Sequence, residues 1–212
     1  MEKGSVPLLG VMISGRGSNL QALVAAIDDG KLRARIAVVI SNVPEVAGLE
    51  VARRAGIETL MLPHREHTSR DAYDRALATA LGERRIRLVC LAGFMRMLGP
   101  AFCESFPSAV LNVHPSLLPS FPGPHAQRQA IDHGVKVSGA TVHFVTPELD
   151  AGPIVSQRAV PVVDDDTPAT LGARVLAVEH EIYPAAIERI LWEPWHIAGR
   201  RVVFGSRAQA LR

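Results

Sequence analysis

The sequence has little of what several classes of protein require. Its 212 residues contain only two cysteines, Cys90 and Cys103, each among apolar neighbours and without a CxxC pattern. We therefore expect two reduced core thiols in a cytoplasmic protein, rather than a disulfide framework or a metal site. No segment reaches the ~18 consecutive apolar residues of a membrane span. Residues 1–7 lack the apolar region and cleavage site of a signal peptide.

The chain also lacks a large excess of charge of either sign. The 23 Lys and Arg residues oppose 21 Asp and Glu residues, which gives a formal net charge of +2, and the charges are dispersed along the chain. A nucleic-acid-binding surface needs a basic face or stripe, so we expect neither a nucleic-acid nor a membrane partner. With 48% hydrophobic and 21% charged residues, the composition is typical of a globular protein that buries its core as one domain.

The first half of the chain alternates strand-like and helix-like segments. Apolar runs predict strands, and apolar residues at helical spacing predict helices. The predicted strands are residues 7–13, 34–40, 58–62, 86–92 and 109–113, and the predicted helices are residues 19–29, 46–55 and 69–81, the last with Ser69 as its N-cap. This order indicates an α/β protein with a mostly parallel, Rossmann-like sheet and helices on both faces. Ligands bind such sheets beyond the carboxyl ends of the strands, where Gly17, Gly93 and Asn112 fall.

The pattern changes in the second half. Residues 120–127 contain Pro122, Gly123 and Pro124 and predict a loop. Residues 137–145 and 154–163 predict two strands that pair antiparallel. Residues 167–190 predict a long helix that Pro184 should kink or split, and the chain from residue 192 on should be peripheral.

The end of the strand at 109–113 carries the strongest chemical signal. Asn112 and His114 are two positions apart, so in an extended chain their side chains point to the same side. Pro115 stiffens the next residues of the chain, and a carboxylate, Asp150, comes later in the segment ELDAGP. Amide, imidazole and carboxylate together suit acyl chemistry that develops an oxyanion. The alternative is structural: most of the eight histidines in the chain are expected to be structural, and Asp150 precedes a turn.

Three further motifs each leave two interpretations open. Residues 14–20, SGRGSNL, join a strand to a helix. Here Ser18 and Asn19 either bond a phosphate or cap the helix, although the GxGxxG and Walker patterns are absent. Residues 91–98, LAGFMRML, form either an apolar slot for a planar heterocycle or a core strand that runs into a loop. Residues 179–184, EHEIYP, indicate by spacing alone a solvated helical face.

Together these motifs resemble the phosphoribosylglycinamide formyltransferases, folate-dependent enzymes of purine synthesis. The similar blocks lie between about residues 7 and 190 and are ISGRGSNLQ, SRDAYD, LAGFMRML, LNVHPSLLP, TVHFVTPELDAGPI and EHEIYP. The resemblance implies transfer of the formyl group of 10-formyltetrahydrofolate to the amine of 5'-phosphoribosylglycinamide, without a metal. It also implies one formyltransferase domain over residues 1–212. This domain would comprise a mononucleotide-binding half (1–113), a part that completes the folate cleft (114–190) and a peripheral tail (191–212).

The resemblance also assigns roles to individual residues. The implied catalytic residues are Asn112, His114 and Asp150. The implied substrate-binding residues are Gly17, Ser18 and Asn19 for the phosphate, Gly93 and Pro115 for the glycinamide, and Glu179 for the ribose hydroxyls. The implied folate-binding residues are Arg70, Met95, Arg96, Met97, Leu98, Val145 and Asp150. Two departures from the family pattern, Gln127 in place of a second histidine and Leu176 in place of a polar residue, concern substrate affinity. The implied partners are small molecules, and a homodimer is compatible with them.

Three alternatives stay open beside this interpretation. A formyltetrahydrofolate hydrolase uses water in place of the amine and usually carries an N-terminal regulatory domain, which we do not expect here. A methionyl-tRNA formyltransferase needs a further C-terminal RNA-binding domain, for which the chain is too short. A non-catalytic folate- or phosphometabolite-binding module is the third, and the intact set of Asn112, His114 and Asp150 argues against it.

Overall fold

The computed structural model describes residues 6–205. The chain divides into two compact units, Met1–Leu111 and Asn112–Arg212. The boundary falls inside a strand, β5 (Val110–His114), so that this strand continues from the first unit into the second. Residues 206–212, which belong to the tail expected to be peripheral, lie outside the described residues, as do residues 1–5.

The first unit is built on parallel strands. Its strands are β1 (Leu8–Ile13), β2 (Arg35–Ser41), β3 (Glu58–Met61) and β4 (Leu88–Leu91). Strand β1 pairs with β2 on one side and with β4 on the other, and β2 pairs with β3, every pair being parallel. Leu9, Val11 and Ile13 of β1 are fully buried. The apolar runs therefore form the centre of this unit's core, as parallel strands covered on both faces require.

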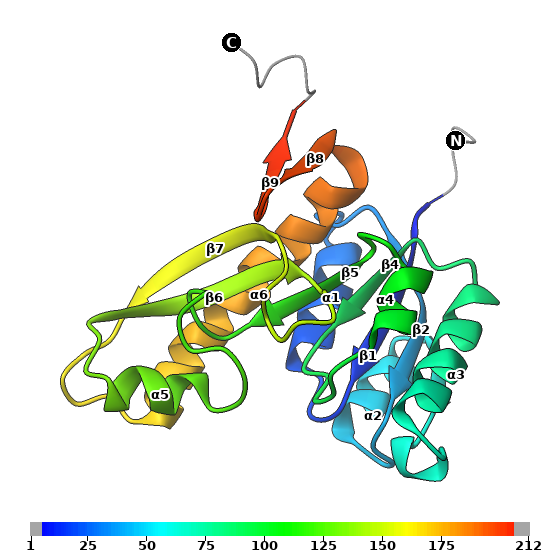
Figure 1. Cartoon of the computed structure of the whole chain (residues 1–212), viewed down its shortest axis with the longest axis horizontal. Helices are drawn as coiled ribbons and strands as arrows, with labels where there is room; N and C mark the ends of the chain where they lie inside the picture. The colour runs from blue at the N-terminus through cyan, green and yellow to red at the C-terminus, as the bar shows by residue number, and fades with distance from the viewer. Residues whose placement is uncertain (1–5, 206–212) are drawn as a thin grey trace. The chain divides into compact units, whose positions relative to one another are not determined.

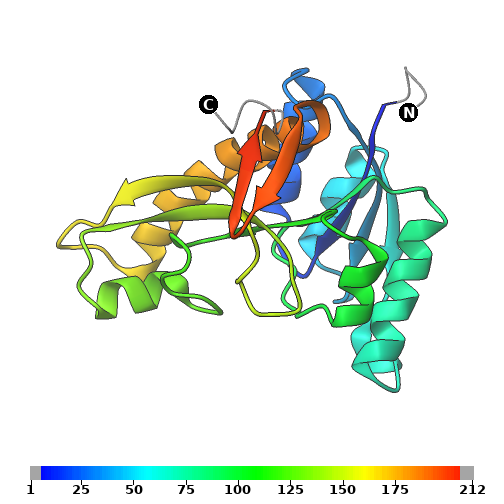
Figure 2. The same ribbon diagram turned by 45° about the horizontal axis from the view of Figure 1, so that its top comes forward.

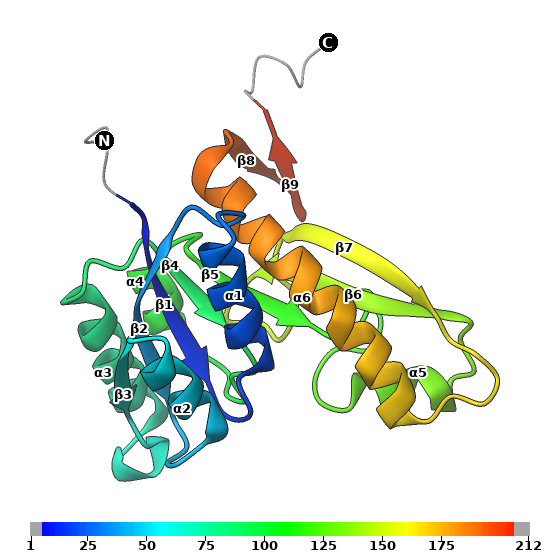
Figure 3. The ribbon, with the colours of Figure 1, turned by 180° about the vertical axis from the view of Figure 1, so that it is seen from behind.

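Helices cover both faces of this parallel sheet (Figures 1 and 3). On one face α1 (Ser18–Asp28) lies beside α2 (Ala47–Arg54), and on the other α3 (Arg70–Gly82) lies beside α4 (Pro100–Ser105). A short 3-10 turn (His64–Glu66) precedes α3. The hydroxyl of Ser69 accepts the N–H of Ala72 at 3.1 Å, so the predicted N-cap of α3 is confirmed.

The second unit combines antiparallel strands with a long helix. Its elements after β5 are α5 (Ala126–Asp132), β6 (Val137–Phe144), β7 (Ile154–Pro161), α6 (Pro168–Trp192), β8 (Trp195–Ala198) and β9 (Arg201–Phe204). Strands β6 and β7 pair antiparallel, and α6 packs against both (Figure 3). The hairpin of β8 and β9 follows α6, with β9 meeting β7 in parallel at Ile154 and Arg201 (Figure 2).

Pro184 was predicted to kink or split helix α6, and the structure shows that it does not split it. The helix runs without interruption from Pro168 to Trp192, with Pro184 inside it. A proline at this position removes one backbone N–H donor. The buried face on either side of it, including Tyr183, Ala186 and Ile187, continues past the proline, because this face packs against β6 and β7. Tertiary packing therefore outweighs the local cost of the proline.

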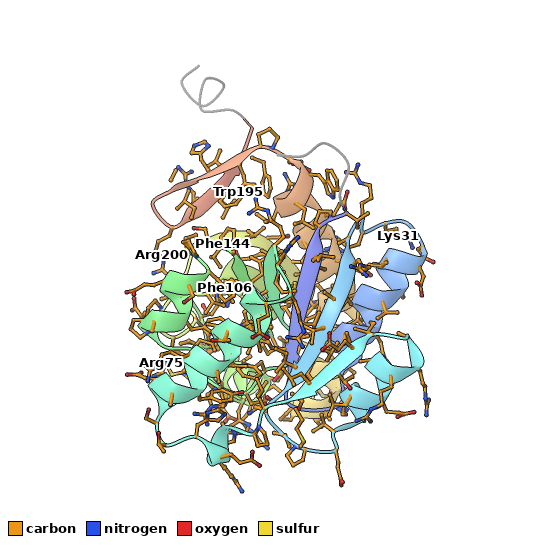
Figure 4. All side chains as sticks on the ribbon, turned by 90° about the vertical axis from the view of Figure 1, so that its right-hand side faces the viewer. Lys31, Arg75, Phe106, Phe144, Trp195 and Arg200 are labelled. Carbon is orange, nitrogen blue, oxygen red and sulfur yellow. The ribbon has the colours of Figure 1, made fainter. Side chains whose placement is uncertain are left out.

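The predicted fold class is confirmed: the strands of the first unit are parallel, and the C-terminal part holds antiparallel strands and a long helix. Helices α4 and α5 and the hairpin of β8 and β9, all of them short, were not predicted. The hairpin depends on tertiary contacts, for example the Trp195 ring at 5.1 Å from that of Phe144 (Figure 4). Among the described residues, no helix is both long and apolar enough to cross a membrane.

Candidate active site

Strand β5 places the predicted amide and imidazole on one side of the chain. Asn112 and His114 belong to the same regular strand, two positions apart, so both side chains leave the same face. Asn112 is half-buried and His114 is buried. Their backbone positions are fixed by a regular strand, which holds a pair of side chains more accurately than a loop does.

Asp150 joins this pair from the loop between β6 and β7. Its Oδ2 lies 3.4 Å from His114 Nδ1 and accepts the N–H of Gly123 at 2.8 Å. The Asp150 backbone is left-handed, with a φ of 49°. Aspartate is one of the few non-glycine residues that adopt this region readily, so the residue type and the turn agree. The structure thus brings Asn112, His114 and Asp150 together within the second unit.

A fourth member of this cluster, His143, was not predicted from the sequence. Its Nδ1 lies 2.9 Å from the carbonyl oxygen of Phe144, its Nε2 lies 3.2 Å from Asn112 Nδ2, and the same Nε2 lies 3.7 Å from Asp150 Oδ1. Burial lowers the pKa of His143 below its ordinary value, against smaller opposing effects of the Phe144 hydrogen bond and the Asp150 charge. The imidazole is therefore neutral near pH 7. Nδ1–H donates to the Phe144 carbonyl, which leaves Nε2 to accept from the Asn112 amide.

This arrangement fixes the orientation of the Asn112 side chain. Because a neutral Nε2 only accepts, it requires the NH₂ group of Asn112 rather than its carbonyl oxygen. The amide carries a second N–H, which is available to a ligand oxygen. His143 was missed because a single histidine inside the apolar run of β6 indicates a core residue. Its one sequence signal is the polar alternation of Thr141 and His143 along the strand.

Thr141, on the same face of β6 as His143, supports the segment that comes after His114. Its hydroxyl donates to the carbonyl of Ser116 at 2.6 Å and accepts the N–H of Leu118 at 3.0 Å. The side chain of Gln157 on β7 donates to both Thr141 Oγ1 and the Leu118 carbonyl. Residues 116–118 are therefore tied to two strands, which stiffens the chain next to the cluster.

His114 Nε2 lies 2.9 Å from the carbonyl oxygen of Phe121. Both ring nitrogens of His114 thus face oxygen acceptors, Phe121 on one side and Asp150 on the other, which suits an imidazolium with two N–H donors. Ser116 directs its hydroxyl at the carbonyls of Ser120 and Phe121. Because these contacts include no general base, they do not activate Ser116 as a nucleophile.

The glycine-rich segment of residues 14–20 lies in the first unit. Gly17 precedes the first residue of α1 with a φ of 77°, and a Cβ at Gly17 would lie 2.6 Å from the Cα of Gly48. Only glycine fits this close contact between two backbones. Gly17 therefore takes the N-cap position, and Ser18 and Asn19 are the first two residues of α1 rather than its caps. No acidic side chain lies in the first turn of α1, so the positive end of the helix dipole is not neutralised there.

The other predicted residues of the first unit come after β4. Gly93 has a φ of 74°, and Met95 and Met97 are exposed. Leu98 is buried, and the guanidinium of Arg96 lies 5.4 Å from the centre of the Tyr73 ring. The remaining predicted contact is Arg70, whose Nε lies 4.0 Å from the buried carboxylate of Asp74. Two methionine side chains on the surface beside a glycine suit an apolar ligand.

The predicted residues Pro115, Val145 and Glu179 belong to the second unit. Pro115 directly follows β5, Val145 follows β6, and Glu179 is buried on α6. The burial of Glu179 contradicts the solvated helical face that its spacing alone indicated, since α6 is packed against α5, β6 and β7. Gln127 lies on α5, where its Cγ faces Gly172 of α6, and Leu176 is half-buried. Within residues 6–205, no three His, Cys, Asp or Glu side chains are arranged to hold a metal ion.

Comparison with known proteins decides the family. A protein-family model described as formyl transferase matches residues 9–187. The chain belongs to the formyl transferase family. The resemblance drawn from the motifs is thereby confirmed, and it extends to solved structures. Glycinamide ribonucleotide transformylase 1 from Symbiobacterium toebii superposes with a TM-score of 0.93 at 49% identity, covering 96% of each chain.

Relatives in the formyl transferase family occur both as single enzymes and within larger proteins. Phosphoribosylglycinamide formyltransferase from Escherichia coli is 45% identical over 190 residues, covering 90% of this chain and 87% of that protein. The human trifunctional purine biosynthetic protein adenosine-3 is 49% identical over 180 residues, but the chain spans only 18% of its length. A formyltetrahydrofolate deformylase from Pseudomonas syringae also superposes, with a TM-score of 0.87 at 27% identity, covering 96% of this chain and 67% of that one.

Proposed function

We propose that the protein transfers the formyl group of 10-formyltetrahydrofolate to the amine of 5'-phosphoribosylglycinamide, the third step of de novo purine synthesis. The observation that carries this proposal is the cluster of the second unit, in which Asp150 lies 3.4 Å from His114 while buried His143 orients the amide of Asn112. The likeness to phosphoribosylglycinamide formyltransferases over nine-tenths of the chain supports it.

In this proposal the amine nitrogen attacks the formyl carbon directly, and the formyl oxygen becomes an oxyanion. The second N–H of Asn112 and the Nε2–H of His114 stabilise this charge, with the oxyanion taking the place of the Phe121 carbonyl at His114. One preorganised donor of this kind typically contributes about 10²- to 10³-fold in rate. No covalent intermediate with the protein is needed.

Asp150 has two roles in this scheme. Its carboxylate faces Nδ1 of His114 and so favours the imidazolium that the oxyanion requires. It also accepts the proton that the attacking nitrogen loses, directly or through one water. The C–N10 bond then breaks, and N10 of the departing folate gains a proton. One proton has thus moved from the amine to N10, and the carboxylate is regenerated.

The remaining assignments concern binding. We infer that Gly17, Ser18 and Asn19 hold the substrate phosphate at the N-terminus of α1, where backbone N–H groups and the helix dipole favour an anion. Glu179 would bond the ribose hydroxyls, and Gly93 and Pro115 would line the glycinamide site. For the folate we assign the exposed Met95 and Met97 with Arg96, Leu98 and Val145 to the pterin, and Arg70 to the tail. A homodimer stays a prediction.

The test measures turnover of 10-formyl-5,8-dideazafolate with and without glycinamide ribonucleotide. Turnover is monitored by the change in absorbance that accompanies deformylation. We expect a change that requires the ribonucleotide.

Asp150→Asn should lower kcat about 10²- to 10⁴-fold, because the amide can neither accept the proton nor favour the imidazolium. Asparagine also tolerates the left-handed backbone, so the fold should be kept. Asp132→Asn, at a carboxylate on the last turn of α5, is the matched control. Near-wild-type kcat in Asp150→Asn would refute the role of Asp150.

The second candidate is hydrolysis of 10-formyltetrahydrofolate, in which water replaces the amine. The structural likeness to the deformylase from Pseudomonas syringae favours it. A deformylation rate that is the same with and without the ribonucleotide would indicate the hydrolase. Binding of the folate analogue without any turnover would instead indicate a non-catalytic binding module.

A further inference from the structure

Ser14 follows β1 and makes two hydrogen bonds to the segment that comes after β4. Its backbone N–H donates to the carbonyl of Gly93 at 3.1 Å, and its hydroxyl oxygen accepts the N–H of Met95 at 2.8 Å. Both contacts lie within the first unit. Gly93 and Met95 are two of the residues assigned above to the glycinamide site and the pterin. The side chain of a residue in the glycine-rich segment is thus directed at the other binding segment.

The hydroxyl proton of Ser14 is also used in a hydrogen bond. Because the N–H of Met95 only donates, the Ser14 oxygen accepts there, and its proton points to Asn42 Oδ1 at 2.5 Å. Asn42 is buried directly after β2, and its Nδ2 lies 3.4 Å from His64 Nδ1. The Ser14 hydroxyl is therefore held from both sides and is not aimed at the N-terminus of α1.

The chain between Ser14 and α1 is anchored separately. The carbonyl of Gly15 accepts the N–H of Gly48 at 3.0 Å, and Gly17 packs against the same glycine. The phosphate-binding residues proposed above thus keep their support from α2 when the Ser14 hydroxyl is removed. Loss of that hydroxyl should affect Met95 selectively, because Gly93 keeps its hydrogen bond to the backbone N–H of Ser14.

We propose that Ser14 is a positioning residue for the folate co-substrate, although it lies in the segment that would bind the phosphate. Its hydroxyl sets the backbone at Met95, which is assigned to the pterin, and so governs folate affinity rather than ribonucleotide affinity. Gly93, assigned to the glycinamide site, is held by the backbone N–H of Ser14 and not by the hydroxyl. The proposal rests on the proposed function, because the identity of the bound heterocycle comes from there. If Ser14 only satisfied backbone hydrogen bonds at the end of β1, its loss would not change the KM values of the two substrates differently.

The test compares the KM values of both substrates in matched serine variants. Ser14→Ala should raise the KM for the formyl folate about 3- to 10-fold, the usual effect of one lost hydrogen bond. The KM for the ribonucleotide and kcat should stay within about twofold. Ser18→Ala should do the reverse, raising the KM for the ribonucleotide alone. Ser14→Thr, which keeps the hydroxyl, should recover most of the folate affinity. Ser105→Ala, which removes an exposed hydroxyl bonded to the Ala101 carbonyl, is the control.

Amide hydrogen exchange of residues 93–97 in the free protein supplies a readout that does not depend on turnover. We expect faster exchange in Ser14→Ala than in the wild type, and recovery in Ser14→Thr. An unchanged folate KM, or equal rises in both KM values, would overturn the proposal. Should the wild type show no turnover, the proposed function fails. The Kd of the dideazafolate analogue in the same variants then decides the role of Ser14 on its own.

Discussion

At the scale of single residues, the proposed chemistry depends on side chains that hold one another in place. Asn112 is oriented by His143, and His114 is held between Phe121 and Asp150. That Asn112, His114 and Asp150 would gather was predictable, because the motifs place them at a strand end and a turn, where functional side chains concentrate. His143 was not, since its neighbours in β6 are mostly apolar and only the three-dimensional contacts reveal its partner.

His143→Ala should lower kcat about 10- to 100-fold, because it leaves an N–H of the half-buried Asn112 amide without its acceptor, at a cost of about 1–3 kcal/mol. His143→Gln, whose side-chain oxygen can approach the position of Nε2, should lose less. Steady-state kcat is the measurement, with His133→Ala on the exposed end of α5 as the control. Equal losses in the alanine and glutamine variants would contradict an orienting role for Nε2.

The pH dependence of this contact results from the lowered pKa of His143. A histidine with a depressed pKa in the folded state stabilises the protein above the unfolded value of about 6.5. That contribution is lost as the pH falls from there through the folded value. We therefore expect an acid-side loss of both stability and kcat in the wild type that is weaker in His143→Gln, which has no imidazole to protonate.

At the scale of elements, the strands and helices of the first unit were predictable because each buries a continuous apolar run or an apolar stripe. The short elements were not. Helix α4 has six residues and α5 seven, too few to show a period. The strands β8 and β9 are held by contacts such as the Arg189 guanidinium, 3.6 Å from the centre of the Phe204 ring. Such contacts join residues from different elements, so no local sequence pattern predicts them.

The start of α6 supplies a prediction about stability. Asp166 accepts hydrogen bonds from the Val163 N–H, the Thr170 hydroxyl and the Arg174 guanidinium, and the Arg174 bond above all lowers the pKa of Asp166. A depressed carboxyl pKa contributes stability above the unfolded value of about 4, which is lost as the pH falls through the folded value. Asp166→Asn should therefore lower Tm at pH 7.

The difference in Tm between the wild type and Asp166→Asn should shrink as the pH is lowered below about 4. Asp165→Asn, at the exposed neighbouring carboxylate, should leave Tm nearly unchanged at every pH. A difference that stays constant across the acid range would show that the Asp166 charge does not stabilise this helix start.

The turn that carries Asp150 supplies a second prediction at this scale. A Cβ at Gly152 would lie 1.8 Å from the carbonyl oxygen of Phe144, so Gly152→Ala must shift β6 or the turn. We expect a loss of about 1–3 kcal/mol in the free energy of unfolding, measured by urea denaturation. Gly82→Ala, at a helical position with open space around its Cβ, should be neutral or slightly stabilising. Equal stabilities would contradict the close contact.

At the scale of the whole molecule, the sequence motifs were sufficient to predict the fold class and the family. Several blocks occur in one order over most of the chain, and a chance match of all of them is far rarer than a match of any one. The proposed reaction rests on fewer groups, the cluster of Asn112, His114, His143 and Asp150. Structural similarity alone leaves transfer and hydrolysis both open, because the chain superposes on a deformylase as well as on a transformylase.

The most direct test of formyl transfer is therefore the fate of the formyl carbon. The purified protein is given 10-formyltetrahydrofolate with a ¹³C-labelled formyl group and an equal amount of glycinamide ribonucleotide, and the products are separated and measured by mass spectrometry. We predict that the label appears in the formylated ribonucleotide, one for each folate consumed, and that this transfer is largely lost in Asp150→Asn. Label recovered as formate, with the ribonucleotide unchanged, would contradict a transferase.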